Sequence, residues 1–215
     1  MSMIAVVDYG MGNLRSVAKA LEHVAADARV VVTGDARQIA EADRVVFPGQ
    51  GAARDCMAHL LERDLIEPVR QAADEKPFLG ICMGLQVLMT HSRENGGVDC
   101  VGLFDGEVEY FGDRLAAEEQ GNLLKIPHMG WNSVSQRQSH PLWQGIEDDS
   151  RFYFVHSYYV APRERDIVAG VTHYGIDFVS AIAHEHVFAV QCHPEKSAAD
   201  GLQLLKNFVG WDGQP

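Results

Sequence analysis

The stretch Phe78-Leu79-Gly80-Ile81-Cys82-Met83-Gly84-Leu85-Gln86 joins an apolar run to a segment of helical character, with a cysteine between two glycines at the junction. A sharp turn from strand to helix holds its central residue in a sparsely allowed backbone conformation and therefore needs small neighbours. This is the arrangement of a nucleophile elbow, with Cys82 at the position where a serine is usual. A thiol presented near a helix N-terminus is a candidate thiolate nucleophile, so Cys82 requires a base and an acid elsewhere in the chain.

Strand and helix signals alternate around this stretch in the first half of the chain. Asn13 is placed to cap the first helix, in which Leu14, Val17, Ala18, Leu21 and Val24 share one face. Strands are expected at Met3–Asp8, Arg29–Thr33, Asp43–Phe47 and Pro77–Ile81, and helices at 13–26, Ala36–Glu41, 54–74 and Gly84–Thr90. The alternation predicts a mainly parallel sheet covered by helices on both faces.

The second half of the chain has a different character. Between about 91 and 150 glycines and polar residues interrupt every pattern, and Arg114 to Gly121 is expected to be an exposed excursion. Strands are expected at Arg151–Val155, Ile167–Thr172, Phe178–Ala183 and His186–Gln191, and a closing helix at Ala198–Val209. The short spacing of these strands favours antiparallel pairing. We therefore predict one α/β domain over residues 1–215, with a mixed, mainly parallel sheet flanked by helices.

The composition excludes several classes of protein. Hydrophobic residues make up 47% and charged residues 22% of the 215 residues, as in a globular domain. The 18 Lys and Arg against 30 Asp and Glu give a formal charge of −12, which disfavours nucleic acid and anionic membranes as partners. The sequence contains no apolar run long enough to span a bilayer and no basic leader at its start, so a cytoplasmic location is expected.

The spacing of the cysteines argues against two further kinds of protein. The four cysteines, Cys56, Cys82, Cys100 and Cys192, contain no C-x-x-C pair. A disulfide framework and a zinc ribbon are therefore both disfavoured. Cys192 is expected to be a packed strand residue.

Ligands in open α/β sheets collect at the carboxyl ends of the parallel strands. The turns at 9–13, 48–52 and 80–84 each follow a predicted strand and belong to that edge. The turn Pro48-Gly49-Gln50-Gly51 exposes backbone amides with little side-chain cover. An amide of Gly49, Gln50 or Gly51, together with the Met83 amide, could hold a developing oxyanion.

The segment His193-Pro194-Glu195 supplies candidate partners for the thiol. In extended backbone residues i and i+2 point the same way, so Glu195 could orient the His193 ring and leave its other nitrogen to face Cys82. Taken alone, a cysteine beside glycine is usually a small buried residue, and Pro-Gly-x-Gly is usually only a turn. Their occurrence together at strand ends predicts a Cys82–His193–Glu195 triad.

These segments resemble the class I, or triad-type, glutamine amidotransferases, and the resemblance spans essentially the whole chain. The family has an oxyanion loop like 48–51, a G-x-C-x-G-x-Q elbow like Gly80 to Gln86 and a terminal His-Pro-Glu like 193–195. The resemblance implies a flavodoxin-like core, no cofactor and no metal, and hydrolysis of glutamine through a γ-glutamyl thioester on Cys82, with His193 protonating the departing ammonia. Gln50 is a departure, because the family more often has an apolar residue between the two glycines.

Among these enzymes the chain is most similar to the glutaminase subunits of imidazole glycerol phosphate synthases, which act in histidine biosynthesis. Four further stretches carry this similarity, namely Asp8–Asn13, Ile126–Asn132, Phe152–Tyr158 and Gln191–Ser197. It implies a heterodimer with a (β/α)₈-barrel synthase, which receives the ammonia and makes imidazole glycerol phosphate and an aminoimidazole carboxamide ribotide.

The similarity also implies roles for individual residues. Gln86 and Glu94 match glutamine-binding positions, and a carboxylate such as Glu94 suits the α-ammonium of the substrate. The backbone around His156-Ser157-Tyr158 is expected to line the same pocket. Positions that match the synthase-facing interface are Asn13, Trp131, Tyr153 and Lys196. Without the similarity, Trp131 would be read as a core aromatic and Lys196 as a solvated charge.

The sequence also allows two alternative functions and one alternative site. A paralogous amidotransferase with a different acceptor would keep the triad, but the run Ile126–Asn132 speaks against it. A non-catalytic regulatory subunit would not need Cys82, His193 and Glu195 intact. The stretch His184-Glu185-His186 is expected to place two imidazoles on one strand face, yet two ligands do not make a metal site.

Overall fold

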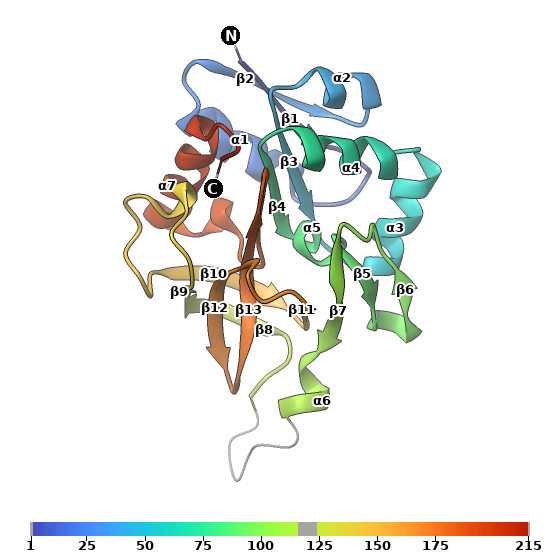
Figure 1. Cartoon of the computed structure of the whole chain (residues 1–215), viewed down its shortest axis with the longest axis vertical. Helices are drawn as coiled ribbons and strands as arrows, with labels where there is room; N and C mark the ends of the chain where they lie inside the picture. Colours follow the sequence, from blue (N-terminus) through green and yellow to red (C-terminus); the bar gives the residue numbers. More distant parts are fainter. Residues whose placement is uncertain (1, 116–123, 215) are drawn as a thin grey trace.

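One large mixed sheet runs through the centre of the molecule, with helices on both of its faces (Figure 1). The structure is a computed structural model that describes residues 2–115 and 124–214. Within these ranges twelve strands form the large sheet and two more form a separate pair. The mixed sheet and its flanking helices confirm the predicted α/β fold class.

The parallel half of the sheet contains the four strands expected in the first half of the chain and, from the second half, the strand expected at His186–Gln191. Its order is β2 (Ala28–Thr33), β1 (Ser2–Val7), β3 (Arg44–Gly49), β4 (Phe78–Cys82) and β14 (Val187–Val190). All four neighbour pairs in this series are parallel. Every residue of β4 and β14 is buried, as is typical of central strands covered on both faces.

The other half of the sheet is largely antiparallel, as the short strand spacing predicted. From β14 the order continues through β13 (Ile176–His184), β11 (Tyr158–Pro162), β7 (Phe104–Tyr110), β5 (Met89–Ser92) and β6 (Val98–Asp99). Beside β13 lie β12 (Val168–Tyr174) and then β9 (Ser135–Gln136). The separate antiparallel pair consists of β8 (His128–Ser133) and β10 (Arg151–His156).

The helices divide between the two faces of the sheet. On one face α1 (Leu14–Val24) packs against α7 (Ala198–Gly210), and both share a core with alternate side chains of β1 and β4. The other face is covered by α2 (Ala36–Glu41), α3 (Ala53–Glu62) and α4 (Ile66–Glu75). Shorter helical pieces are α5 (Met83–Gln86), α6 (Phe111–Leu115) and the 3₁₀ turns η1 (Glu94–Gly96), η2 (Pro141–Trp143) and η3 (Pro194–Lys196).

Several expectations about local structure are wrong. The helix expected at Gly84–Thr90 ends at Gln86, and the chain enters β5 at Met89. The apolar run after Gln86 has no polar face, and pairing of β5 with β7 overrides its helical character. Asn13 holds the N-cap position of α1, but its side chain accepts no capping hydrogen bond; only its carbonyl does, from the Val17 amide at 3.2 Å.

The weakly patterned region also contains more order than its sequence indicates. Strands β5, β6, β7, β8 and β9 lie between residues 89 and 136, and β11 was not expected either. In the predicted excursion, Arg114 and Leu115 belong to the end of α6, whereas residues 116–121 lie outside the described residues.

The two imidazoles of His184-Glu185-His186 do not share a strand face. His184 ends β13, and Glu185, with a φ of 47°, turns the chain back so that β14 begins at Val187 rather than at His186. His186 Nδ1 donates to the Gly213 carbonyl at 2.9 Å, while His184 packs edge-on to Phe104. Among the described residues, no group of three His, Cys, Asp or Glu side chains could hold a metal ion.

No helix in the described ranges has the length and apolar character needed to cross a membrane.

His140 makes the stability of the fold sensitive to acid. Its ring is buried against Phe188 and Trp211, and Nδ1 accepts a hydrogen bond from the Leu142 amide at 3.1 Å. Burial lowers the pKa of His140 from 6.5 to about 4. Between these two values the unfolded chain binds a proton that the native chain excludes, so the native state loses stability as the pH falls from 6.5 towards 4.

We predict that His140→Asn flattens this acid loss, because asparagine retains an acceptor for the Leu142 amide but does not titrate. The free energy of unfolding in urea, measured from pH 7.5 to 4.5, should fall less steeply in the variant by about 1.4 kcal/mol per pH unit. The exposed His23→Asn is the control and should keep the parent slope. Equal slopes in His140→Asn and the parent would contradict the prediction.

Candidate active site

Cys82 lies at a sharp, strained turn between β4 and α5. Its φ of 55° and ψ of −108° are outside the regions that non-glycine residues normally adopt. Gly84 must be small, because a Cβ on it would lie 1.8 Å from the Phe47 carbonyl oxygen. A Cβ on Gly80 would approach the Ala189 Cβ to 2.8 Å and the Gly84 carbonyl oxygen to 3.0 Å. The small neighbours and the unusual backbone confirm the elbow geometry predicted from the sequence.

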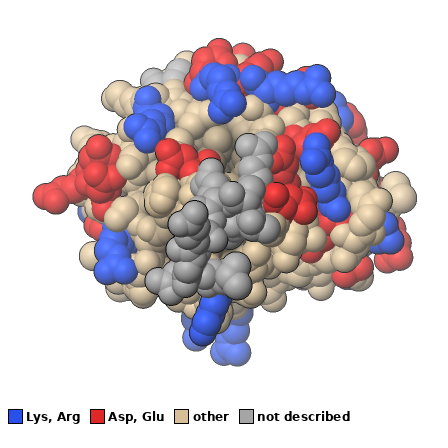
Figure 2. All heavy atoms as spheres, turned by 90° about the horizontal axis from the view of Figure 1, so that it is seen from below, with Lys and Arg blue, Asp and Glu red and all other residues tan. Residues whose placement is uncertain are grey.

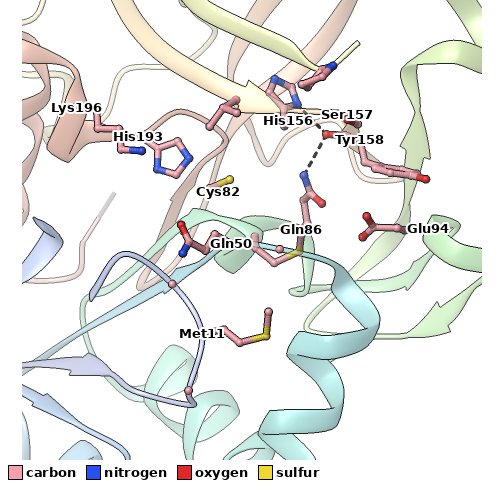
Figure 3. A pocket seen from close by; sticks show the side chains of 16 residues that line it. Met11, Gln50, Cys82, Gln86, Glu94, His156, Ser157, Tyr158, His193 and Lys196 are labelled. Carbon is pink, nitrogen blue, oxygen red and sulfur yellow. Dashed lines mark hydrogen bonds between the residues drawn. The ribbon is translucent and has the colours of Figure 1, made fainter. Parts of the chain in front are cut away.

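The elbow opens into a cavity of about 760 Å³. The three turns predicted to share the carboxyl edge of the sheet all reach it, through Met11, Gln50 and Cys82 among others (Figure 3). The lining consists of Gly10, Met11, Gly12, Gln50, Gly51, Cys82, Met83, Gln86, Glu94, Pro127, Val155, His156, Ser157, Tyr158, His193 and Lys196. Most residues proposed from the sequence for catalysis or substrate binding therefore meet at one site.

His193 and Glu195 form the predicted pair beside the cysteine. His193 Nδ1 donates to Glu195 Oε1 at 2.9 Å, and the side chains are only 5% and 1% exposed. The other ring nitrogen, Nε2, is buried and faces Cys82 (Figure 3). The contact is as expected, but the backbone is extended only at His193: the 3₁₀ turn η3 follows it and carries Glu195 back beside the ring.

The surroundings of His193 favour its protonated form. Burial opposes the charge, but hydrogen bonding to Cys82 and Glu195 and the negative charges of these two groups outweigh it and raise the pKa of His193 to about 10. The imidazole beside the sulfur is therefore an imidazolium at neutral pH.

The candidate oxyanion residues divide into two groups. Gln50, Gly51 and Met83 line the cavity. Gly49 does not, because it lies opposite Cys82 in the β3–β4 ladder, where a Cβ would come within 2.5 Å of the Tyr9 hydroxyl and 2.7 Å of the Met83 Cβ. Gly49 therefore allows β3, Tyr9 and the elbow to approach closely.

The candidate substrate-binding residues lie across the cavity from His193 (Figure 3). Gln86 Nε2 donates to the Tyr158 carbonyl at 3.0 Å, and its Oε1 is buried without a partner. The Glu94 carboxylate is fixed by the Ala53 amide, which donates to Oε2 at 2.7 Å. Ser157 also lines the cavity.

His156 lines the cavity but is locked into the structure. Its Nδ1 donates to the Tyr158 carbonyl at 2.7 Å, and its Nε2 accepts from His128 Nδ1 at 2.9 Å. Burial lowers the pKa of His156 to about 3 and that of His128 to about 4, so both rings are neutral.

Three of the four candidate interface residues lie together on and beside the separate strand pair. Trp131 and Tyr153 are opposite each other on β8 and β10, with ring centroids 6.2 Å apart. Lys196 Nζ lies 5.9 Å from the centroid of the Tyr153 ring and its side chain reaches the cavity. Asn13 follows the cavity-lining Gly12.

Sequence reasoning missed Gln191, whose Nε2 lies 3.6 Å from Cys82 Sγ. It also missed Met11, Pro127 and Val155 in the cavity lining. The available signal for Gln191 was its position two residues before His193. Met129, in β8, was also missed as a surface residue and is 64% exposed.

Comparisons with known proteins give the family and the fold of the chain. A family model described as "Glutamine amidotransferase class-I" matches residues 5–210. The "Imidazole glycerol phosphate synthase subunit HisH" of Pseudomonas putida is 58% identical over 214 residues, which cover 100% of both chains. That of Thiobacillus denitrificans is 59% identical over 209 residues, covering 97% of this chain and 91% of its own. A solved structure, "Structure of PurLQS from Thermotoga maritima", shares the fold with a TM-score of 0.71 at 17% identity, covering 97% of this chain and 98% of that one.

We predict that Gly84→Ala destabilises the chain by about 3 kcal/mol, since the new methyl group forces the elbow away from the Phe47 carbonyl. Urea unfolding measures the effect. Gly210→Ala is the matched control: it has open space around it at the end of α7 and should change stability by less than about 1 kcal/mol. A Gly84→Ala chain as stable as the parent would show that the close approach is not needed.

We also predict that Glu195→Gln lowers the pKa of His193 by about 1–3 units, because it removes a negative charge in hydrogen-bond contact with the ring while burial remains. An NMR titration of the labelled imidazole measures the shift. Glu164→Gln, an exposed change of the same type, should leave the titration of His193 in place. An unchanged midpoint in Glu195→Gln would rule out the carboxylate as the group that holds the proton on His193.

Proposed function

The chain belongs to the class-I glutamine amidotransferase family, and from this premise we propose that it is the glutaminase subunit of an imidazole glycerol phosphate synthase. The observation that carries the proposal is the strained Cys82 beside the buried His193–Glu195 pair in one cavity. A thiol, a protonated imidazole and an orienting carboxylate are the groups needed to cleave an amide through a thioester.

Catalysis begins with Cys82 as the nucleophile. Its sulfur attacks the side-chain amide carbon of glutamine, and the carbonyl oxygen becomes an oxyanion. The Met83 amide and an amide of the Gln50–Gly51 turn are the proposed donors to that oxyanion. The His193 imidazolium gives its proton to the amide nitrogen, ammonia leaves, and a γ-glutamyl thioester remains on the sulfur.

Hydrolysis of the thioester restores the starting state. Neutral His193 takes a proton from water as the water oxygen adds to the thioester carbon, and the thiolate departs to release glutamate. Glu195 stabilises the imidazolium that forms again. The raised pKa of His193 fits this cycle, because the imidazolium is the form required before ammonia departs.

Substrate binding is proposed on the opposite wall of the cavity. Gln86 Oε1 is a buried acceptor without a partner, and leaving such an atom unsatisfied costs free energy. An N–H of the substrate would satisfy it. The fixed Glu94 carboxylate is the proposed partner of the α-ammonium, and the backbone of His156-Ser157-Tyr158 forms the adjacent wall.

A synthase subunit is the partner that the relatives' names imply, and we propose that it has a (β/α)₈-barrel fold and forms a heterodimer with this chain. Met129 and Trp131, both in β8, are 64% and 43% exposed, which is unusual for large apolar side chains. Together with Asn13, Tyr153 and Lys196 they are the proposed docking surface. Because Lys196 also lines the cavity, ammonia formed there would be released beside the proposed docking surface.

In this proposal the synthase uses the ammonia to make imidazole glycerol phosphate and an aminoimidazole carboxamide ribotide.

We also propose a single domain over residues 1–215 and a cytoplasmic location, which suits four free cysteines. The net charge of −12 supports partners other than nucleic acid or membranes. On the face seen in Figure 2, basic side chains lie in separate groups between acidic ones.

We predict that Cys82→Ala abolishes imidazole glycerol phosphate synthesis from glutamine in the complex, because the thioester cannot form. Synthesis from added ammonium salts should continue at the parent rate, since it bypasses this site. Glutamate release, measured with and without the synthase and its nucleotide ligand, provides the second readout. Cys100→Ala is the control, as Cys100 lies outside the cavity lining. Glutamine-dependent synthesis by Cys82→Ala would refute the nucleophile assignment, and turnover only with another acceptor would indicate a paralogous amidotransferase.

A further inference from the structure

The carboxamide of Gln191 lies between the nucleophile and a substrate-binding residue. Its Nε2 is 3.6 Å from Cys82 Sγ, and its Oε1 accepts a hydrogen bond from Gln86 Nε2 at 2.9 Å. Gln191 is fully buried, and Cys82 is 5% exposed. The triad chemistry assigns no part to this side chain.

Backbone pairing fixes where Gln191 can be. It comes directly after Val190, which lies opposite Ile81 in the parallel β14–β4 ladder, so it is the neighbour of Cys82 across the two strand ends. The Gln191 amide donates to the Ser180 carbonyl at 2.8 Å, which ties it to β13 as well. The side chain is therefore held from two strands.

A backbone carbonyl determines which end of the carboxamide faces the sulfur. The Tyr158 oxygen can only accept, so the Gln86 atom 3.0 Å from it must be the NH₂ group. The same NH₂ group reaches Gln191 at 2.9 Å, which must then present its oxygen. The remaining end of Gln191 is an N–H donor, and it points at Cys82 Sγ.

A donor at this place has a chemical consequence. The sulfur is an anion before it attacks and again when the thioester is hydrolysed, and hydrogen bonds to charged groups are stronger than those between neutral groups. His193 faces the sulfur as well (Figure 3). An N–H from Gln191 stabilises the thiolate and holds its direction in both of these states.

We propose that Gln191 is a positioning residue for the nucleophile, in which the Tyr158 carbonyl, through Gln86, forces an N–H donor onto Cys82 Sγ. The proposal rests on the assignment of Cys82 as the nucleophile. If it is right, the reactivity of the Cys82 thiol depends on the Gln191 N–H. A glutamine that is only packed in the core would not affect this reactivity.

The test measures alkylation of Cys82 by iodoacetamide between pH 5 and 10, followed by mass spectrometry of the peptide that contains it. Gln191→Leu removes the donor, and Gln191→Glu replaces it with an oxygen at nearly the same shape. We expect the pH midpoint of alkylation to rise by about one pH unit in Gln191→Leu, as for loss of one hydrogen bond to a charged group, and by more in Gln191→Glu.

The same variants are then assayed in the complex with the synthase. Glutamine-dependent kcat should fall about tenfold, with a smaller change in KM, because the effect is on the reacting sulfur. Gln203→Glu on α7 is the matched control and should leave both the alkylation midpoint and kcat unchanged. Folded Gln191 variants with the parent midpoint would overturn the proposal.

A measurement on the unaltered chain covers the case in which the variants do not fold. The side-chain NH₂ resonances of Gln191 should move with the same midpoint as Cys82 alkylation, and this movement should be lost in Cys82→Ala. Resonances that do not respond to the thiol would overturn the proposal. Alkylation needs neither glutamine nor the partner, so this outcome is distinct from loss of glutaminase activity in Cys82→Ala, which tests the proposed function itself.

Discussion

The parallel pairing of β4 with β14 is the constraint on which the site depends. These strands are more than 100 residues apart in the sequence, yet the ladder places Ile81 opposite Val190, so that both chains leave the sheet at the same edge. One exit is the elbow at Cys82 and the other is the turn that carries His193. On the other side of β4, the β3 ladder brings Gly49 opposite Cys82. A Cβ on Gly49 would clash with the Tyr9 hydroxyl and the Met83 Cβ, so β3 packs closely against the elbow. The pairing of these strands therefore places Cys82 and His193 at the same edge of the sheet.

The buried histidines show how burial and partners compete to set the charge of an imidazole. Burial alone disfavours the imidazolium, and it keeps His128, His140 and His156 neutral at ordinary pH. His193 is buried as well, but the sulfur and the Glu195 carboxylate on either side of its ring reverse the outcome. The neutral pair His128–His156 holds the cavity wall through directed hydrogen bonds, whereas the charged His193 is available for proton transfer. The same residue type thus serves structure or chemistry according to what lies beside it.

The parts of the site that the sequence predicted are those encoded locally. The elbow requires glycines at fixed offsets from Cys82, and the His193–Glu195 contact is made within one turn. The parallel half of the sheet was readable because its strands are strongly apolar and all except the edge strand β2 are largely buried. The helix after the elbow was overestimated, because pairing of β5 with β7 is not visible in a short apolar run. Gln191 was missed for the same reason, as its contact with Cys82 exists only once β4 and β14 are paired.

The separate β8–β10 pair joins the proposed docking surface to the wall of the cavity. Trp131 and Tyr153 face each other on these strands, and two residues further along β10 Val155 lines the cavity. No ladder connects this pair to the large sheet among the described strands. It is held instead by contacts with other elements, among them the packing of Phe154 and His156 on Phe178 of β13 and the hydrogen bond from the His193 amide to the Tyr153 carbonyl at 2.9 Å. His128 on β8 donates to His156, and both His156 and Gln86 donate to the Tyr158 carbonyl. Gln86 also donates to Gln191, whose Nε2 contacts Cys82. A partner bound on β8 would therefore contact a strand that is connected to Cys82 through a continuous series of hydrogen bonds. The fold therefore makes the wall of the cavity in which glutamine is proposed to be cleaved part of the same small unit as the surface that the synthase is proposed to bind.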